Sequence, residues 1–207
     1  MIKKYDELNS VHIDVLREIG SIGSGNAATS LASVIDRKIM ISVPQVQILE
    51  NNEAVKKLGG AEKIVSAVLV KCHGEIDGML LYLQSLEFIN VVLRNVLSSS
   101  VERYEQLNEM HFSALVEIGN IMISSYVNAL STLTGLTIKL TIPANTINML
   151  GGIMNVPMTE YGYESDKIMI INGNIICDGQ EIESNLLMVP DIASLNTIMK
   201  KLGVLGG

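Results

Sequence analysis

The sequence predicts an α/β fold of the α+β type: a two-layer body made from two copies of an αββ(β)α unit, related by approximate twofold symmetry. Two observations lead to this prediction. The chain repeats itself, and each copy reads as a long helix, two or three strands and a closing helix. No Pro-rich or Gly-Ser linker separates the copies, whose junction is LSSSVERYEQ. We therefore expect one domain over residues 1–207, composed of tandem repeats at about 1–99 and 100–207.

The repeat is visible without any gap over the long helices. At an offset of 99 residues, YDELNSVHIDVLREIGSI from Tyr5 aligns with YEQLNEMHFSALVEIGNI from Tyr104, and the register holds to Pro44 and Pro143. Further along, LLYLQSLEFINVVLRNVL resembles LLMVPDIASLNTIMKKLG at an offset of 106, so the second copy carries an insertion of seven residues. The similarity indicates an internal duplication.

Each long helix has apolar and small residues at spacings of three and four, which predicts a stripe facing the core. The two stripes are Ile13, Leu16, Gly20, Gly23, Ala27, Leu31 and Val34, and Phe112, Leu115, Gly119, Met122, Tyr126, Leu130 and Leu133. A glycine inside a helix costs about 1 kcal/mol relative to Ala. We therefore expect Gly20 and Gly23 to allow close helix-to-sheet or helix-to-helix approach.

Strands are predicted where branched and apolar residues dominate. These segments are KIMISVPQVQIL, IVSAVLVKC and GMLLYLQ in the first copy, and TIKLTIPANTINML, KIMIINGNIIC and SNLLMVP in the second.

Composition excludes several function classes. The chain has 22 acidic and 15 basic residues, for a net charge of -7 and no basic run, which argues against nucleic acid as a partner. No apolar run approaches the ~18 residues of a membrane-spanning helix, and MIKKYDELNS lacks the apolar stretch of a secretory signal. We expect a cytoplasmic protein without membrane insertion. Cys72 and Cys177 are expected to be unpaired thiols of the core.

Opposite the apolar stripe, each long helix presents a line of polar and small residues. The first helix has Asp14, Glu18, Ser21 and Gly25, and the second has Ser113, Glu117, Asn120 and Ser124. Such spacings place side chains on one line of a helix. A solvated face is the alternative interpretation, but none of these positions is Lys or Arg, and the glutamate recurs in both copies.

These residues form the pattern [DS]-x3-E-x2-N-x22-P, which resembles the motif of the CheC, CheX and FliY family of chemotaxis phosphatases. The second copy fits completely, through Ser113, Glu117, Asn120 and Pro143. The first copy fits through Asp14, Glu18 and Pro44 but has Ser21 where Asn is expected. The flanking EIGSIGSGNAATSLASV is also similar to the family, and the resemblance extends over nearly the whole chain.

The resemblance implies hydrolysis of the aspartyl phosphate on the response regulator CheY-P, with no covalent intermediate on the phosphatase. Asn120 would orient the attacking water and Glu117 would anchor the partner. Glu18 would keep the anchoring role in the first copy, whereas Ser21 is shorter and has a single hydroxyl. No cofactor is expected on this chain, and Mg²⁺ is expected to come from the regulator.

The resemblance also implies binding of the receptor-modifying enzyme CheD. An alternative function is a non-catalytic adaptor that binds CheD or a response regulator, since the first copy lacks the Asn. A flagellar switch component like FliY is less favoured, because no switch-type domain follows Gly207.

Other candidate sites in the sequence are less specific. The glycines of GSIGSGN lack the preceding strand and the Lys-Ser/Thr of a phosphate-binding loop, so helix packing is preferred. His12 and His111 occupy equivalent positions without other ligands at metal-binding spacing, and we expect them to cap or pack. No Ser-His-Asp arrangement is readable in the sequence.

Overall fold

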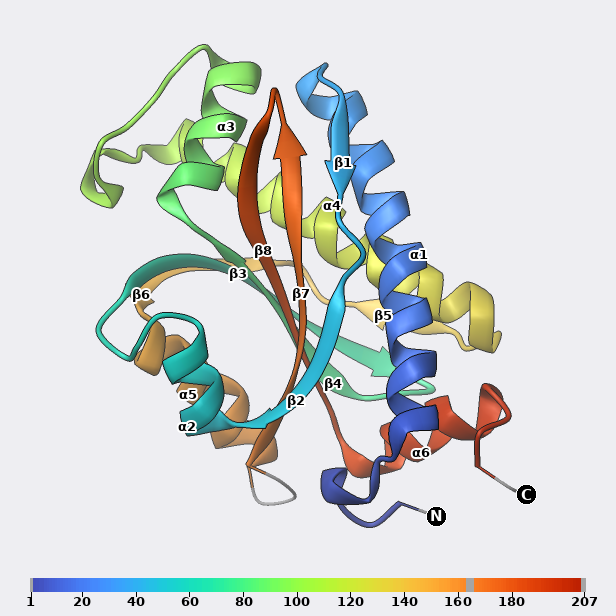
Figure 1. Ribbon diagram of the computed structural model, residues 1–207. Helices are drawn as coiled ribbons and strands as arrows, with labels where there is room; N and C mark the ends of the chain where they lie inside the picture. The colour runs from blue at the N-terminus through green and yellow to red at the C-terminus, as the bar shows by residue number, and fades with distance from the viewer. Residues whose placement is uncertain (1, 163–165, 206–207) are drawn as a thin grey trace.

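The computed structural model describes residues 2–162 and 166–205 (Figure 1). In chain order the elements are η1 (Tyr5–Glu7), α1 (Ser10–Ile35), β1 (Ile39–Ile41), β2 (Gln45–Glu50), α2 (Asn51–Lys57), β3 (Ile64–Gly74), β4 (Gly78–Gln84), α3 (Leu86–Leu97), η2 (Tyr104–Gln106), α4 (Glu109–Thr134), β5 (Ile138–Leu140), β6 (Ala144–Met149), α5 (Leu150–Tyr161), β7 (Lys167–Cys177), β8 (Gln180–Pro190) and α6 (Ile192–Lys201). The single-domain boundary at 1–207 stays a prediction, and its two end residues lie outside the described part of the chain.

The two long helices begin at matching caps. Asn9 Oδ1 accepts a hydrogen bond from the His12 backbone N–H at 3.1 Å, and His12 Nδ1 accepts one from the Asn9 N–H at 3.0 Å. Asn108 and His111 form the same reciprocal pair before α4. Such a box satisfies backbone donors that the first helical turn leaves unpaired. The capping role expected for both histidines is therefore confirmed.

The described strands form one curled antiparallel sheet in which the repeats exchange their edge strands. The order is β1-β7-β8-β4-β3-β5, with β2 also paired to β7 and β6 also paired to β3. Thus β1 and β2 of the first repeat lie against a strand of the second repeat, and β5 and β6 lie against a strand of the first. At the centre, Leu81 pairs with Leu187, its own counterpart at the offset of 106 residues.

Helices cover both faces of this sheet. The larger core lies under α1, α3, α4 and α6, and a second core lies between the sheet and the helices α2 and α5. The predicted α/β fold with duplicated repeats is confirmed. The sequence analysis did not include α2 and α5, which add a further layer to the expected two-layer body.

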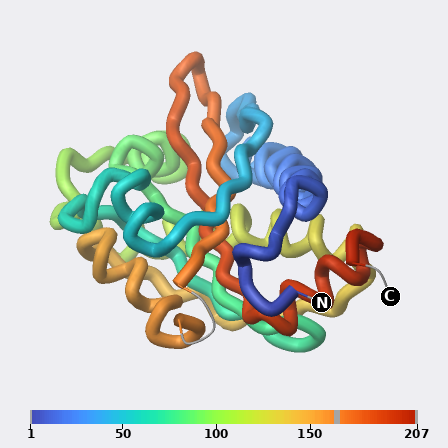
Figure 2. Tube along the Cα trace, turned by 60° about the horizontal axis from the view of Figure 1, so that its bottom comes forward, coloured from blue at the N-terminus to red at the C-terminus, as the bar shows by residue number. Residues whose placement is uncertain are grey.

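Glycines bring α1 close to both α4 and the sheet (Figures 1 and 2). A Cβ at Gly23 would lie 2.6 Å from Tyr126 Cδ1 on α4, and a Cβ at Gly20 would lie 3.3 Å from Pro44 Cγ. The Ser24 and Tyr126 hydroxyls share a buried hydrogen bond of 2.7 Å across the same helix pair. Both kinds of close approach expected from Gly20 and Gly23 are confirmed.

The predicted apolar stripes are wrong at their last positions. Val34 is 44% exposed and Leu133 is 41% exposed. The buried positions in the final turn are Ile35 and Thr134, which follow Leu31 and Leu130 by four residues rather than three. The stripe drifts around the helix because 3.6 residues make one turn.

We expect Gly23→Ala to lower the free energy of unfolding by about 1–3 kcal/mol, because the added methyl overlaps the Tyr126 ring in a packed interface. Gly25→Ala is the matched control, since nothing lies within 4 Å of a Cβ there. The control should raise stability by up to about 1 kcal/mol through helix propensity. Denaturant unfolding measures both, and equal stability of the two variants would contradict the close helix contact.

Candidate functional site

The polar residues predicted from the motif lie on the outer faces of the two long helices. We call Asp14, Glu18 and Ser21 of α1 the first-repeat stripe, and Ser113, Glu117 and Asn120 of α4 the second-repeat stripe. Both glutamates are exposed, and Ser21 and Asn120 are half-buried at the equivalent position. The structure therefore brings the sequence-predicted residues of each copy together on one helix.

A glycine beside the last residue of each stripe sets how closely the helix backbone approaches the sheet. A Cβ at Gly119 would lie 2.6 Å from Val68 Cβ on β3, so α4 rests its backbone on the sheet next to Asn120. In α1 the corresponding Gly20 faces Pro44 and Ile171 of β7. The motif proline Pro44 is buried in this contact, which gives it a structural place beneath the first-repeat stripe.

In the second-repeat stripe, the carboxylate and the amide are available to a partner. Within residues 2–162 and 166–205, no hydrogen bond or ion pair engages the Glu117 carboxylate or the Asn120 side-chain amide. Ser124 Oγ donates to the Asn120 backbone carbonyl at 2.6 Å, and Ser113 Oγ donates to the Glu109 carbonyl at 3.0 Å. These bonds engage the two serine hydroxyls and the helix backbone, and they leave the Glu117 carboxylate and the Asn120 amide unengaged.

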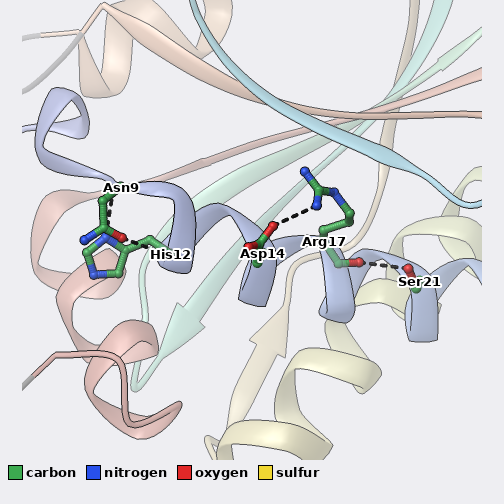
Figure 3. Close-up of polar contacts among 5 residues, drawn as sticks. All are labelled: Asn9, His12, Asp14, Arg17 and Ser21. Carbon is green, nitrogen blue, oxygen red and sulfur yellow. Dashed lines mark hydrogen bonds and ion pairs between the residues drawn. The ribbon is translucent and has the colours of Figure 1, made fainter.

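In the first-repeat stripe, Asp14 and Ser21 both bind to Arg17 of the same helix (Figure 3). Arg17 pairs with Asp14 at 2.7 Å, and Ser21 Oγ donates to the Arg17 carbonyl at 3.0 Å. Arg17 therefore places a positive charge beside the first-repeat stripe. This charge was not predicted from the sequence. The signal was present in the Asp-x2-Arg spacing, typical of helical ion pairs. The equivalent residue in α4 is Val116, so only the first repeat carries this charge.

Neither stripe forms a pocket for a small molecule among the larger cavities described. Those of about 440 and 290 Å³ are lined by other residues, near Tyr5 and Lys167 and near Asn51 and Met158. Among the described residues, no group of three or more His, Cys, Asp or Glu side chains could hold a metal ion. The stripes are therefore exposed helix surfaces and do not line these cavities.

The two cysteines are free and buried, as predicted. Burial raises the pKa of the Cys72 thiol to about 12, which keeps it in the unreactive protonated form at neutral pH. None of the helices in residues 2–162 and 166–205 is long and apolar enough to cross a membrane.

Comparison with known proteins identifies the class to which this architecture is related. Residues 11–48 and 110–146 match the model of the CheC-like family, so the match falls on both repeats and includes both stripes. The chain is 28% identical over 203 residues to the CheY-P phosphatase CheC of Bacillus subtilis (strain 168), covering 96% of this chain and 97% of that protein. The resemblance to the CheC, CheX and FliY family is thereby confirmed, and the chain is related to chemotaxis phosphatases.

Two further comparisons concern FliY proteins. The flagellar motor switch phosphatase FliY of Bacillus subtilis (strain 168) is 25% identical over 144 residues, which cover 69% of this chain and 37% of that protein. The crystal structure of Thermotoga maritima FliY superposes with a TM-score of 0.74 at 23% identity, covering 95% of this chain and 98% of that chain. At this identity the superposition shows the shared fold alone.

We expect Asn120→Ala to unfold with the same or slightly greater free energy, because the amide has no hydrogen bond in the described structure and Ala favours helix over Asn by up to about 0.7 kcal/mol. Denaturant titration measures this. A loss greater than about 1 kcal/mol would mean that the amide has a structural role after all.

Proposed function

We propose that this protein accelerates hydrolysis of the aspartyl phosphate on a CheY-type response regulator, and that the second-repeat stripe is the working site. The observation that carries the proposal is that Glu117 and Asn120 lie one turn apart on the same exposed helix face. The described residues engage neither the carboxylate of Glu117 nor the amide of Asn120. The name of the Bacillus subtilis relative, a CheY-P phosphatase, supports the choice of substrate.

The reaction makes a modest demand on the catalyst. Water attacks the phosphorus in line, the bond from phosphorus to the aspartyl oxygen breaks, and the products are an aspartate carboxylate and inorganic phosphate. The two protons of the water leave with phosphate or solvent. Because an acyl phosphate already has a good leaving group, positioning the water is the main task.

The carboxamide of Asn120 is suited to positioning that water. Its oxygen accepts a hydrogen bond from the water while its NH₂ group donates to a phosphoryl oxygen. Both ends of the amide are needed, which explains why a serine hydroxyl is a poor substitute. In the first repeat the hydroxyl of Ser21 already donates to its own helix, so it has no proton left for a phosphoryl oxygen.

Glu117 anchors the regulator by pairing with a basic residue beside the phosphorylation site. The unpaired carboxylate one turn from Asn120 sets the helix in register with the phosphoryl group. This chain supplies no metal to the reaction in our proposal. Mg²⁺ held by the regulator neutralises charge on the phosphoryl oxygens.

A second function, binding without turnover, is favoured by one feature of the first repeat. Glu18 remains exposed there, but Ser21 replaces the amide and Arg17 lies beside it. We propose that the chain also binds CheD, as the resemblance implies, so that it acts as an adaptor in addition to its phosphatase role. Phosphate release from a purified phosphorylated regulator distinguishes this proposal from an adaptor without turnover, because such an adaptor leaves the release rate unchanged.

Asn120→Ala should reduce the acceleration of regulator dephosphorylation by roughly 10²-fold, because it removes donor and acceptor from the transition state. Ser21→Ala, the matched change in α1, should alter the rate less than about twofold. Phosphate release measured with both variants checks the assignment. Full activity in Asn120→Ala would refute the proposed mechanism, and equal losses would show that both repeats work.

The first repeat should regain the most activity when both of its differences are reversed. In an Asn120→Ala background, Ser21→Asn restores the amide, and adding Arg17→Val removes a cation close to where the basic residue of the regulator meets Glu18. We expect the double change to recover several-fold more dephosphorylation than Ser21→Asn alone. If the single change recovers as much, Arg17 has no part in silencing the site.

A further inference from the structure

Each repeat exposes a large apolar side chain to solvent, and the two side chains occupy equivalent positions. Ile142 is 92% exposed and Val43 is 76% exposed, the highest values among the large apolar side chains that the structure describes. Each directly precedes a motif proline, Pro143 or Pro44. A single exposed apolar residue is ordinary. Its recurrence in both copies, at the most solvent-exposed point of the turn, indicates a use outside the folded core.

Both side chains are held out by a rigid support. In the second repeat, the Thr141 N–H donates to the Lys71 carbonyl at 2.9 Å, and Thr141 Oγ1 accepts from the Lys71 N–H at 3.0 Å. Ser42 makes the same two bonds with Asn174, at 2.9 and 2.8 Å. With a proline following, the backbone around the apolar residue is fixed on both sides. Little conformational freedom is left to lose when a partner covers it.

In the first repeat this turn lies directly beside the long helix. In the first repeat the proline after Val43 fits against Gly20, the residue next to Ser21, and β1 and β2 run along α1 (Figure 1). In the second repeat, β6, which follows Ile142 and Pro143, contacts α4. The 99-residue offset relates Ile142 to α4 as it relates Val43 to α1, so a regulator placed over Glu117 and Asn120 would meet Ile142 at the edge of the same surface.

The stripe itself explains why such an anchor is needed. An exposed ion pair of the kind Glu117 offers contributes little affinity. In our proposal the Asn120 amide stabilises the transition state. Contacts made only in the transition state raise the rate and do not strengthen binding of the regulator before reaction. Affinity in protein interfaces comes chiefly from a few residues whose side chains become fully buried and desolvated. Ile142 is the described apolar residue with the most surface left to bury.

We propose that Ile142 is the apolar anchor by which the second-repeat site binds the CheY-type regulator, with its side chain inserted among apolar residues beside the phosphorylation site of the regulator. This inference rests on the proposed function and identifies a residue that sets partner affinity without taking part in the chemistry. Val43 is its counterpart in the first repeat and gives a matched control.

The test compares Ile142→Ser with Val43→Ser in two measurements. A CheY-type regulator of the same organism, activated with beryllofluoride, is titrated to obtain Kd, and phosphate release from the phosphorylated regulator gives kcat and KM. We expect Ile142→Ser to raise Kd and KM about tenfold with kcat changed less than about twofold, as for loss of a buried apolar anchor. Val43→Ser should change each by less than about twofold, and Ile142→Leu should keep affinity near that of the unsubstituted protein.

Three outcomes overturn the inference: an unchanged Kd for Ile142→Ser, an equal loss for Val43→Ser, or a fall in kcat at constant KM. The binding arm does not depend on turnover. A regulator that binds but keeps its phosphate contradicts the proposed function and still tests Ile142. Failure of the unsubstituted protein to bind any activated regulator contradicts both.

Discussion

The exchange of edge strands between the repeats is the constraint on which the rest of this structure depends. Each long helix rests on a strand of the opposite repeat: Gly20 of α1 faces Ile171 of β7, and Gly119 of α4 faces Val68 of β3. The motif proline Pro44 is carried by an edge segment that is itself paired to β7. Each stripe is therefore positioned by both halves of the chain, so the geometry of a site depends on the complete sheet rather than on one copy.

The two stripes lie on corresponding helices of the two repeats, so their side chains can be compared position by position. The helices have equal length and equivalent N-terminal caps, and each places a glycine against a strand of the opposite repeat. On these corresponding helices, the two stripes differ in their side chains. In α4 the carboxylate of Glu117 and the amide of Asn120 are unengaged by the described residues, whereas in α1 the hydroxyl of Ser21 is bonded to its own helix and Arg17 brings a charge where Val116 stands. We interpret the first repeat as scaffold and binding face, and the second as the catalytic copy.

Much of the fold could be predicted because the duplication doubles every local signal. Both long helices were predicted from the ungapped repeat, and the predicted strand segments match the observed strands closely. The helices α2 and α5 escaped prediction, since α2 has only seven residues, and α5 contains Gly151, Gly152 and Pro157, which disfavour a helix. The residues of the stripes were predicted, and their roles stay predictions. The Asp14–Arg17 pair could have been predicted from its spacing of three residues, whereas the exposure of Ile142 required side-chain geometry, because it does not follow from hydrophobic spacing.

The central claim is that a symmetric body carries one complete site. The stoichiometry of binding tests it most directly: titration calorimetry of the intact protein with the beryllofluoride-activated regulator of the same organism, at concentrations spanning weak and tight binding. The account predicts one tightly bound regulator per chain, with any second event at the first repeat much weaker because of Arg17 and Ser21. Two equivalent bound regulators per chain, or none, would contradict it.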